Sequence, residues 1–308
     1  MKDQYCSKII LFGEYSMIFD ATALLVPFRR FSARWVQAAD NMDEQQSFSA
    51  RELLRFCAFL QENGAFAETI DTDAFAEGLR AGWVLASDVQ PGYGLGSSGT
   101  VAAAVYDRYG KAHLQDPVQL KELFGRMESF FHGSSSGIDP LLCWLGRPFR
   151  ISADRVELLD DDILNRGIRI CLIDTKKERK TKPLVEYFKK QLEDPAFAAG
   201  FRDDYLPWVS ACINALVQGD HDAFFTALRH LSAGQLRFFR PMIPDHTAAL
   251  FRGGNDFNFG VKILGAGGGG YMLGFTDDCR KAAELLKDYD VLWLEPDQIN
   301  CGGGEHAD

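Results

Sequence analysis

A short segment between residues 91 and 99 combines the residue types that bind phosphate. Glycines at positions 92, 94, 96 and 99 surround the paired hydroxyls of Ser97 and Ser98. Glycine lets backbone N–H groups approach a ligand closely, and a helix that starts here would turn its positive end toward that ligand. Serine hydroxyls can bond phosphate oxygens or a metal ion, although helix capping would account for one of them. The segment predicts an anion site, with a tight strand-to-helix turn as the alternative.

A second glycine run, Gly265-Ala-Gly-Gly-Gly-Gly270, lies between two apolar segments that predict strands. No clear helix follows it, so its glycines would serve close backbone approach, either to a ligand or within the packed protein. The first segment lacks the GxGxxG spacing of dinucleotide-binding folds, and no GKS or GKT follows it as in P-loops. An oxidoreductase is therefore a distant alternative.

Positive charge is concentrated in the run Lys176, Lys177, Arg179, Lys180 and Lys182. Such a run is usually a solvated loop. Because the chain carries a formal net charge of −10, however, this run is also where an anionic substrate would bind. The same charge argues against a general nucleic-acid partner, which requires a broad basic surface.

The composition is that of an ordinary globular protein: 308 residues, of which 46% are hydrophobic and 25% charged. No run of eighteen apolar residues occurs, and the first residues lack the pattern of a secretion signal. We therefore expect a cytoplasmic location and no membrane partner. The seven cysteines are scattered and never form a CxxC pair, which argues against a disulfide framework and a zinc site.

Apolar periodicity predicts the elements that must position these loops. Ser49 and Glu52 fit a capping box, so a helix is expected over 50–63, ended by Gly64. Strands are expected at 8–12, 23–26 (closed by Pro27), 82–89, 169–173, 257–264, 271–275 and 290–294, and further helices at 98–109, 116–131, 182–192, 208–233 and 278–289. The second half then has the order β-α-α-β-β-α-β of a ferredoxin-like sandwich, with a domain boundary near residue 165.

Three segments, in order along the chain, carry a resemblance to a known superfamily. Pro91-Gly-Tyr-Gly-Leu-Gly-Ser-Ser98 resembles the ATP-binding PxxxGLGSS motif, Lys8-Ile-Ile-Leu-Phe-Gly-Glu-Tyr15 resembles an N-terminal KxxLxGEH segment, and Lys262-Ile-Leu-Gly-Ala-Gly-Gly-Gly-Gly270 resembles a KxTGAGGGG segment. These are motifs of the GHMP kinases, which phosphorylate small molecules with ATP.

Within that superfamily the chain is most similar to the mevalonate kinases. His132-Gly-Ser-Ser-Ser-Gly-Ile-Asp139 resembles their HGxPSGxD loop, and the stretch from Ile170 to Thr181 resembles their substrate loop. Four sites depart from the family pattern: Tyr15 replaces His, Ser135 replaces Pro, Leu264 replaces Thr, and Cys6-Ser7 replaces Pro-Gly. These departures bear more on the substrate than on the class of reaction.

The resemblance implies an α+β fold of two domains. Residues 1–165 would form a ribosomal S5 domain 2-like α/β domain with the ATP-binding loop, and residues 166–308 would form a ferredoxin-like α+β domain. The implied cofactors are ATP and Mg²⁺, and the implied partner is a small molecule, first of all mevalonate. The assembly is left open between a monomer and a homodimer.

The resemblance also assigns roles to individual residues. Asp139 would take the proton of the acceptor hydroxyl, Lys8 would pair with Asp139, and Ser98 and Glu128 would hold Mg²⁺. The implied ATP-binding positions are Pro91, Gly92, Gly94, Leu95, Gly96, Ser97, Ser98, Gly267 and Gly268. The implied substrate-binding positions are Glu14, Tyr15, Arg179, Thr181, Gly265 and Ala266, with the Arg179 guanidinium matching a carboxylate. His132 is assigned no catalytic role, since such a residue is more often a loop or core histidine.

Three other functions compete with a mevalonate kinase. The nearest is a phosphomevalonate kinase or another GHMP kinase that acts on a sugar or an amino alcohol. Diphosphomevalonate decarboxylase shares the fold, but the serine-rich loop expected of it is absent from the sequence. A non-catalytic nucleotide-binding protein of this fold is the third alternative, raised by Tyr15 and Leu264.

Overall fold

The computed structural model describes residues 1–38, 44–89, 93–153, 155–164, 167–178, 181–252 and 256–295. Three residues predicted to bind ligands, Pro91, Gly92 and Arg179, lie outside the described residues. The chain forms two compact units, each assembled from three segments. Unit 1 comprises Met1–Lys8, Pro27–Gln90 and Leu95–Gly146, and unit 2 comprises Ile9–Val26, Pro91–Gly94 and Arg147–Asp308. The domain boundary near residue 165 stays a prediction.

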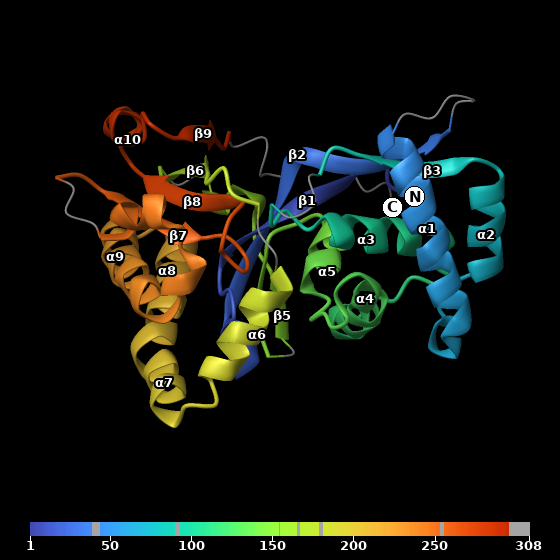
Figure 1. The fold of residues 1–308 in the computed structure, drawn as a ribbon, viewed down its shortest axis with the longest axis horizontal. Helices are drawn as coiled ribbons and strands as arrows, with labels where there is room; N and C mark the ends of the chain where they lie inside the picture. The colour runs from blue at the N-terminus through green and yellow to red at the C-terminus, as the bar shows by residue number, and fades with distance from the viewer. Residues whose placement is uncertain are drawn as a thin grey trace. The chain divides into compact units, whose positions relative to one another are not determined.

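A five-stranded sheet has the order β1-β2-β4-β5, with β3 paired to β2 (Figure 1). Its strands are β1 (Tyr5–Phe12), β2 (Ala23–Gln37), β3 (Trp83–Ser87), β4 (Phe149–Ser152) and β5 (Arg155–Leu158). The pairings of β2 with β3, β2 with β4, and β4 with β5 are antiparallel. Strands β1 and β2 each contribute residues to both units.

The α-helices described in unit 1 are α1 (Glu44–Glu62), α2 (Thr72–Arg80), α3 (Ser97–Tyr109), α4 (Pro117–His132) and α5 (Ile138–Leu145). Helix α3 packs against both α4 and α5, which brings the starts of α3 and α5 and the end of α4 into one region. Fully buried aromatic side chains, among them Phe56, Phe124 and Tyr106, form the core of this unit. The predicted strand-loop-helix order around Ser97 and Ser98 is confirmed.

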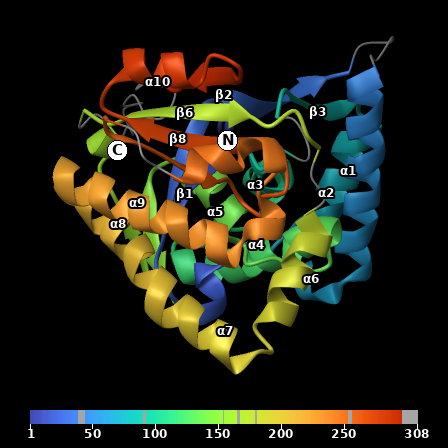
Figure 2. The same cartoon turned by 60° about the vertical axis from the view of Figure 1, so that its left-hand side comes forward.

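Unit 2 contains an antiparallel four-stranded sheet in the order β7-β8-β6-β9. Its strands are β6 (Arg169–Asp174), β7 (Phe259–Ile263), β8 (Tyr271–Thr276) and β9 (Asp290–Trp293), and its helices are α6 (Thr181–Gln191), α7 (Pro195–Gly200), α8 (Leu206–Gln218), α9 (His221–Phe238) and α10 (Cys279–Leu285). Helices α8 and α9 pack together (Figure 2), and α9 also packs on β7. The predicted α+β class, with mixed helices and antiparallel sheets, is confirmed.

Two predicted ends of elements were wrong in the first half of the chain. Pro27 does not close its strand, because β2 runs on to Gln37. It lies between the residues that pair with β4 and those that pair with β3, so on that side its missing N–H removes no ladder hydrogen bond. Ser49 is not a helix cap: α1 already begins at Glu44, and the Ser49 hydroxyl donates to the carbonyl of Leu85.

The helix predicted over 208–233 is two helices. Gly219 ends α8 in the left-handed conformation, at φ 74°, and the Asp220 side chain accepts from Ala223 N to cap α9. The sequence Gly-Asp thus combines a helix stop with a helix start. Among the described residues, no helix has the length and apolar character that crossing a membrane requires, and none of the six described cysteines forms a disulfide.

Candidate active site

Helix α3 begins with backbone groups that could receive an anion. Its N-cap is Gly96, in the left-handed conformation at φ 76°, and none of the described side chains caps the helix. The first-turn N–H groups, which include those of Ser97 and Ser98, therefore keep the positive partial charge of a helix start. The preceding loop is fixed to β1, because Lys8 N donates to the Leu95 carbonyl at 3.0 Å.

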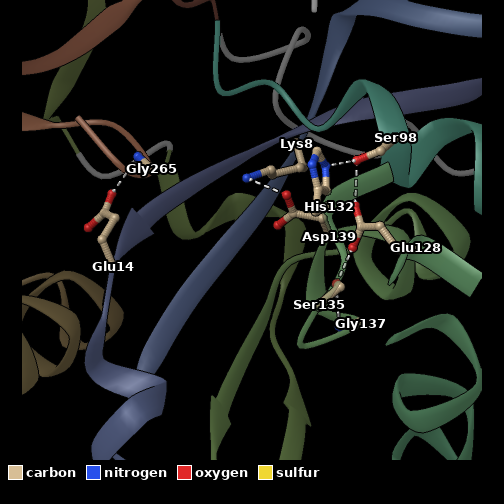
Figure 3. A network of polar contacts seen from close by, with 9 residues as sticks. All are labelled: Lys8, Glu14, Ser98, Glu128, His132, Ser135, Gly137, Asp139 and Gly265. Atoms are coloured by element: carbon tan, nitrogen blue, oxygen red, sulfur yellow. Dashed lines mark hydrogen bonds and ion pairs between the residues drawn. The ribbon is translucent and has the colours of Figure 1, made fainter. Parts of the chain in front are cut away.

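Lys8 and Asp139 form an ion pair beside this helix start (Figure 3). Lys8 Nζ lies 2.8 Å from Asp139 Oδ2, and the two side chains are 4% and 27% exposed. Both groups approach α3 at glycines: a Cβ atom on Gly96 would lie 2.7 Å from Lys8 Cγ, and one on Gly99 would lie 2.9 Å from the Asp139 carbonyl carbon. Two glycines of the predicted phosphate loop thus make room for the protein's own lysine and aspartate.

Ser98 and Glu128 are in direct contact within the same unit. The Ser98 hydroxyl donates to Glu128 Oε1 at 2.6 Å, and the Ser135 hydroxyl donates to Glu128 Oε2. Glu128 is only 3% exposed. Burial raises the pKa of this carboxyl to about 7, and the negative charge of Asp139 adds to the rise.

The second unit brings together Glu14, Lys262 and Gly265. Lys262 Nζ pairs with Glu14 Oε1 and also donates to the Ile263 carbonyl at 2.6 Å, while Gly265 N donates to Glu14 Oε1 at 3.4 Å. The Lys262 and Glu14 side chains are 0% and 3% exposed. Burial raises the pKa of Glu14, and the charge of Lys262 acts in the opposite direction. The pair ties the end of β1 to the glycine run after β7.

Tyr15, predicted as a substrate contact, is held by protein groups. Its backbone is left-handed, at φ 63°. Its hydroxyl donates to the Ala266 carbonyl at 3.1 Å. Its ring centroid lies 4.4 Å from that of Phe188 and 5.3 Å from that of Phe239. The tyrosine therefore joins the predicted substrate position Ala266 to an aromatic cluster.

The run Gly265–Gly270 has five glycines with positive φ, at 265, 267, 268, 269 and 270. Gly268 N donates to the Met242 carbonyl and Gly270 N donates to the Lys177 carbonyl. A Cβ atom on Gly267 would lie 2.8 Å from the Met242 oxygen. Packing within unit 2 thus explains why glycine is needed here, and nucleotide contacts of Gly267 and Gly268 stay a prediction.

The basic run near residue 180 is partly neutralised. Lys176 pairs with Asp290 and lies 3.5 Å from Asp174. Thr181, predicted to contact the substrate, is the exposed first residue of α6. Because Arg179 lies outside the described residues, its role as the carboxylate partner stays a prediction.

Comparison with known proteins finds a family for part of the chain. Residues 53–147 match the family model described as the GHMP kinases N terminal domain. The chain carries a GHMP kinase N-terminal domain. The matched segment includes Ser98, Glu128 and Asp139, whereas Lys8 precedes it. No curated protein matches the sequence.

Solved structures show the GHMP kinase fold over nearly the whole chain. The phosphomevalonate kinase of Streptococcus pneumoniae is similar with a TM-score of 0.64 at 16% identity, covering 95% of this chain and 97% of that one. The L. major mevalonate kinase in complex with R-mevalonate has a TM-score of 0.61 at 16% identity, covering 93% and 90%. Lactococcus lactis galactokinase complexed with galactose has a TM-score of 0.63 at 14% identity, covering 94% and 91%. At such identities these likenesses establish the fold and leave the substrate open.

Two residues with notable contacts, one in each unit, were not predicted from the sequence. His132 Nε2 lies 3.0 Å from Ser98 Oγ, although the sequence gave His132 no catalytic role. Lys262 belongs to the segment that resembles KxTGAGGGG, but its pairing with Glu14 was not predicted, because the two residues are 248 positions apart. A histidine that ends a helix one turn after Glu128 was the available signal for the first. No signal near Lys262 would have identified the second.

The chemistry of Ser98 and Glu128 suits a magnesium ion. A hydroxyl and a carboxylate are hard oxygen ligands, and a carboxylate buried to this degree gains from a cation beside it. Within the described residues, no group of three or more His, Cys, Asp or Glu side chains could hold a metal. Mg²⁺ would therefore also need oxygens from a phosphate group and from water.

The raised pKa of Glu128 predicts how stability depends on pH. Its pKa in the folded protein is about 7, against 4.5 for the free side chain, so the folded state binds more protons between these values. The free energy of unfolding should then fall as pH rises through this window, by about 3 kcal/mol at most. Glu128→Gln should remove this fall, as measured by urea unfolding of the metal-free protein at pH 5 and pH 8.

The matched control for this experiment is Glu122→Gln, which changes an exposed carboxyl of the same helix. This variant should keep the pH dependence of the wild type. If the difference between wild type and Glu128→Gln were the same at both pH values, the Glu128 carboxyl would not be the group that titrates.

Proposed function

We propose that this protein transfers the γ-phosphoryl group of ATP to the hydroxyl of a small molecule, with mevalonate as the first candidate. The observation that carries the proposal is the Lys8–Asp139 ion pair, at 2.8 Å, beside the start of α3. A partly exposed carboxylate and a buried ammonium group next to an uncapped helix start combine a proton acceptor with positive charge for phosphate.

In the proposed reaction, the acceptor oxygen attacks the γ-phosphorus as the bond to the ADP oxygen breaks, and Asp139 takes the hydroxyl proton. Lys8 orients Asp139 through their ion pair and neutralises negative charge on the transferred group. The first-turn N–H groups of α3 and the hydroxyls of Ser97 and Ser98 orient the phosphates. When bound, Mg²⁺ would neutralise charge between the β- and γ-phosphates, held by Ser98 and Glu128.

The choice of acceptor rests on the sequence. The HGSSSGID loop and the Arg179–Thr181 pair favour mevalonate, and Arg179 would hold the mevalonate carboxylate. Phosphomevalonate kinase and other GHMP kinases remain the nearest alternatives, because the pocket and not the fold determines the substrate. A nucleotide-binding protein without turnover is the alternative from another class.

The test is a panel of acceptors. The purified protein is incubated with ATP and Mg²⁺ together with mevalonate, phosphomevalonate, homoserine, galactose or a heptose phosphate, and ADP release is followed. Reactions without acceptor and reactions with excess EDTA give the background. We expect ADP release that depends on mevalonate and on the metal.

Each other outcome changes a different part of the proposal. Turnover with another acceptor would keep the kinase and discard the assignment of Arg179 and Thr181. Binding of ATP without turnover on any acceptor would favour the non-catalytic alternative. Absence of any nucleotide binding would refute the proposal as a whole.

A further inference from the structure

The end of α4 and the loop after it contact both candidate metal ligands from the side. His132, the last residue of α4, lies 3.0 Å from Ser98 Oγ through its Nε2 atom. Ser135, three residues further on, donates its hydroxyl to Glu128 Oε2. Figure 3 shows His132 beside Ser98 and Ser135 beside Glu128.

The direction of the hydrogen bond at His132 follows from the hydrogens available. Ser98 has one hydroxyl hydrogen, and it goes to Glu128 Oε1 at 2.6 Å. The bond between Ser98 Oγ and the imidazole therefore needs its hydrogen from Nε2 of His132. Ser98 is thus held by two bonds, one given to Glu128 and one received from His132, which fixes its rotamer.

Ser135 is itself held firmly by the backbone around it. Its Oγ accepts from Gly137 N at 3.0 Å. Gly137 is left-handed at φ 73°, and a Cβ atom there would lie 1.9 Å from the Lys121 carbonyl oxygen. The hydroxyl that reaches Glu128 is therefore part of a tight turn, and the proline of the similar HGxPSGxD loop could not supply it.

These contacts matter most when a metal is bound. The Ser98–Glu128 hydrogen bond uses an oxygen of each group, and both groups would turn oxygens toward a metal that they share. The bonds from His132 and Ser135 come from outside the pair and can persist. Groups that hold metal ligands in this way commonly change metal affinity by roughly 10- to 100-fold when removed.

From this arrangement we infer that His132 and Ser135 are positioning residues for magnesium-dependent nucleotide binding: His132 orients the Ser98 hydroxyl and Ser135 orients the Glu128 carboxylate. The inference rests on the proposed function and gives a positioning role to two residues other than Lys8 and Asp139. It predicts that their loss weakens nucleotide binding only when the metal is present.

The experiment compares variants that keep shape with variants that keep the hydrogen bond. His132→Phe retains a ring without a donor, whereas His132→Gln places an amide N–H near the position of Nε2. Ser135→Ala removes the hydroxyl and Ser135→Thr keeps it. Ser129→Ala is the control, because the Ser129 hydroxyl donates to the Arg126 carbonyl within α4.

Affinity for a non-hydrolysable ATP analogue is measured by calorimetry with Mg²⁺ and with EDTA. His132→Phe and Ser135→Ala should each lower the affinity with Mg²⁺ roughly 10-fold and leave the affinity in EDTA unchanged. His132→Gln and Ser135→Thr should remain within about 3-fold of the wild type. Thermal unfolding of each variant confirms that it is folded.

Two results would overturn the inference while leaving the proposed function intact. One is an equal loss with and without Mg²⁺, which would mean a structural role. The other is a Gln or Thr variant as weak as its Phe or Ala counterpart. If the wild type bound the analogue no better with Mg²⁺ than with EDTA, magnesium-dependent binding would be refuted, and this inference with it.

Discussion

Replacing Asp139 by asparagine should lower kcat by roughly 10²- to 10⁴-fold while nucleotide affinity stays close to that of the wild type. Asparagine has nearly the same shape, and its Oδ1 can still accept from Lys8, which lies 2.8 Å from the carboxylate. It cannot accept a proton from the acceptor hydroxyl. The change therefore keeps a hydrogen bond to Lys8 but removes both the proton acceptor and the negative charge of the ion pair. Steady-state ADP release and calorimetric titration would measure the effects on kcat and on nucleotide affinity separately.

Asp203→Asn is the matched control, because Asp203 is an exposed aspartate of unit 2. It should leave both quantities unchanged. Turnover by Asp139→Asn within a few-fold of the wild type would show that another group takes the proton. An equal loss of nucleotide affinity and kcat would instead indicate that the substitution disturbs the start of α3.

The second large effect is expected from the buried ion pair of unit 2. Glu14→Leu leaves Lys262 without its countercharge at a site where the lysine side chain is 0% exposed. Breaking a buried pair in this way typically costs roughly 3–5 kcal/mol in the free energy of unfolding. Lys262→Met should cost a similar amount, because it leaves Glu14 buried without its countercharge and hydrogen-bond partner.

The double variant Glu14→Leu/Lys262→Met distinguishes a lost pair from lost packing. Neither charge then remains, so the double variant should lose much less free energy of unfolding than the sum of the two single losses, as measured by urea unfolding. Asp204→Leu provides the control: Asp204 pairs with Arg237 at 2.8 Å, but the side chains are 56% and 62% exposed. That loss should stay below about 1 kcal/mol. Additive losses in the double variant would contradict the account.

Local signals predicted much of this fold from the sequence. The strand before Gly13, the loop and helix around Ser98, and the four strands of unit 2 each have a periodic apolar pattern with turn residues at their ends. The prediction of a single helix over 208–233 was wrong at Gly219, where α8 ends. The apolar pattern continues across this break, and only the Gly-Asp pair marks it. The prediction that Pro27 ends its strand was wrong because the pairing of β2 with its neighbours, which tolerates a proline at this position, has no local sequence signal.

The sequence predicted the contacts of the candidate site residues more fully in unit 1 than in unit 2. In unit 1 the expected pairs, Lys8 with Asp139 and Ser98 with Glu128, are in contact. His132 was missed because its position one turn after Glu128 was not used, and a histidine next to a glycine is more often a loop residue. In unit 2 the glycine run was expected to serve close backbone approach, either to a ligand or within the protein, and its N–H groups at Gly268 and Gly270 donate to carbonyls of the protein.

The Glu14–Lys262 pair also constrains how the chain can fold during synthesis. Its partners are 248 positions apart, and the first segment of unit 2, Ile9–Val26, is made long before β7. Until Lys262 has been synthesised, Glu14 has no countercharge and is more stable in water than in a closed core. The buried pair can therefore form only after β7 has been synthesised, so unit 2 closes late relative to the synthesis of Ile9–Val26.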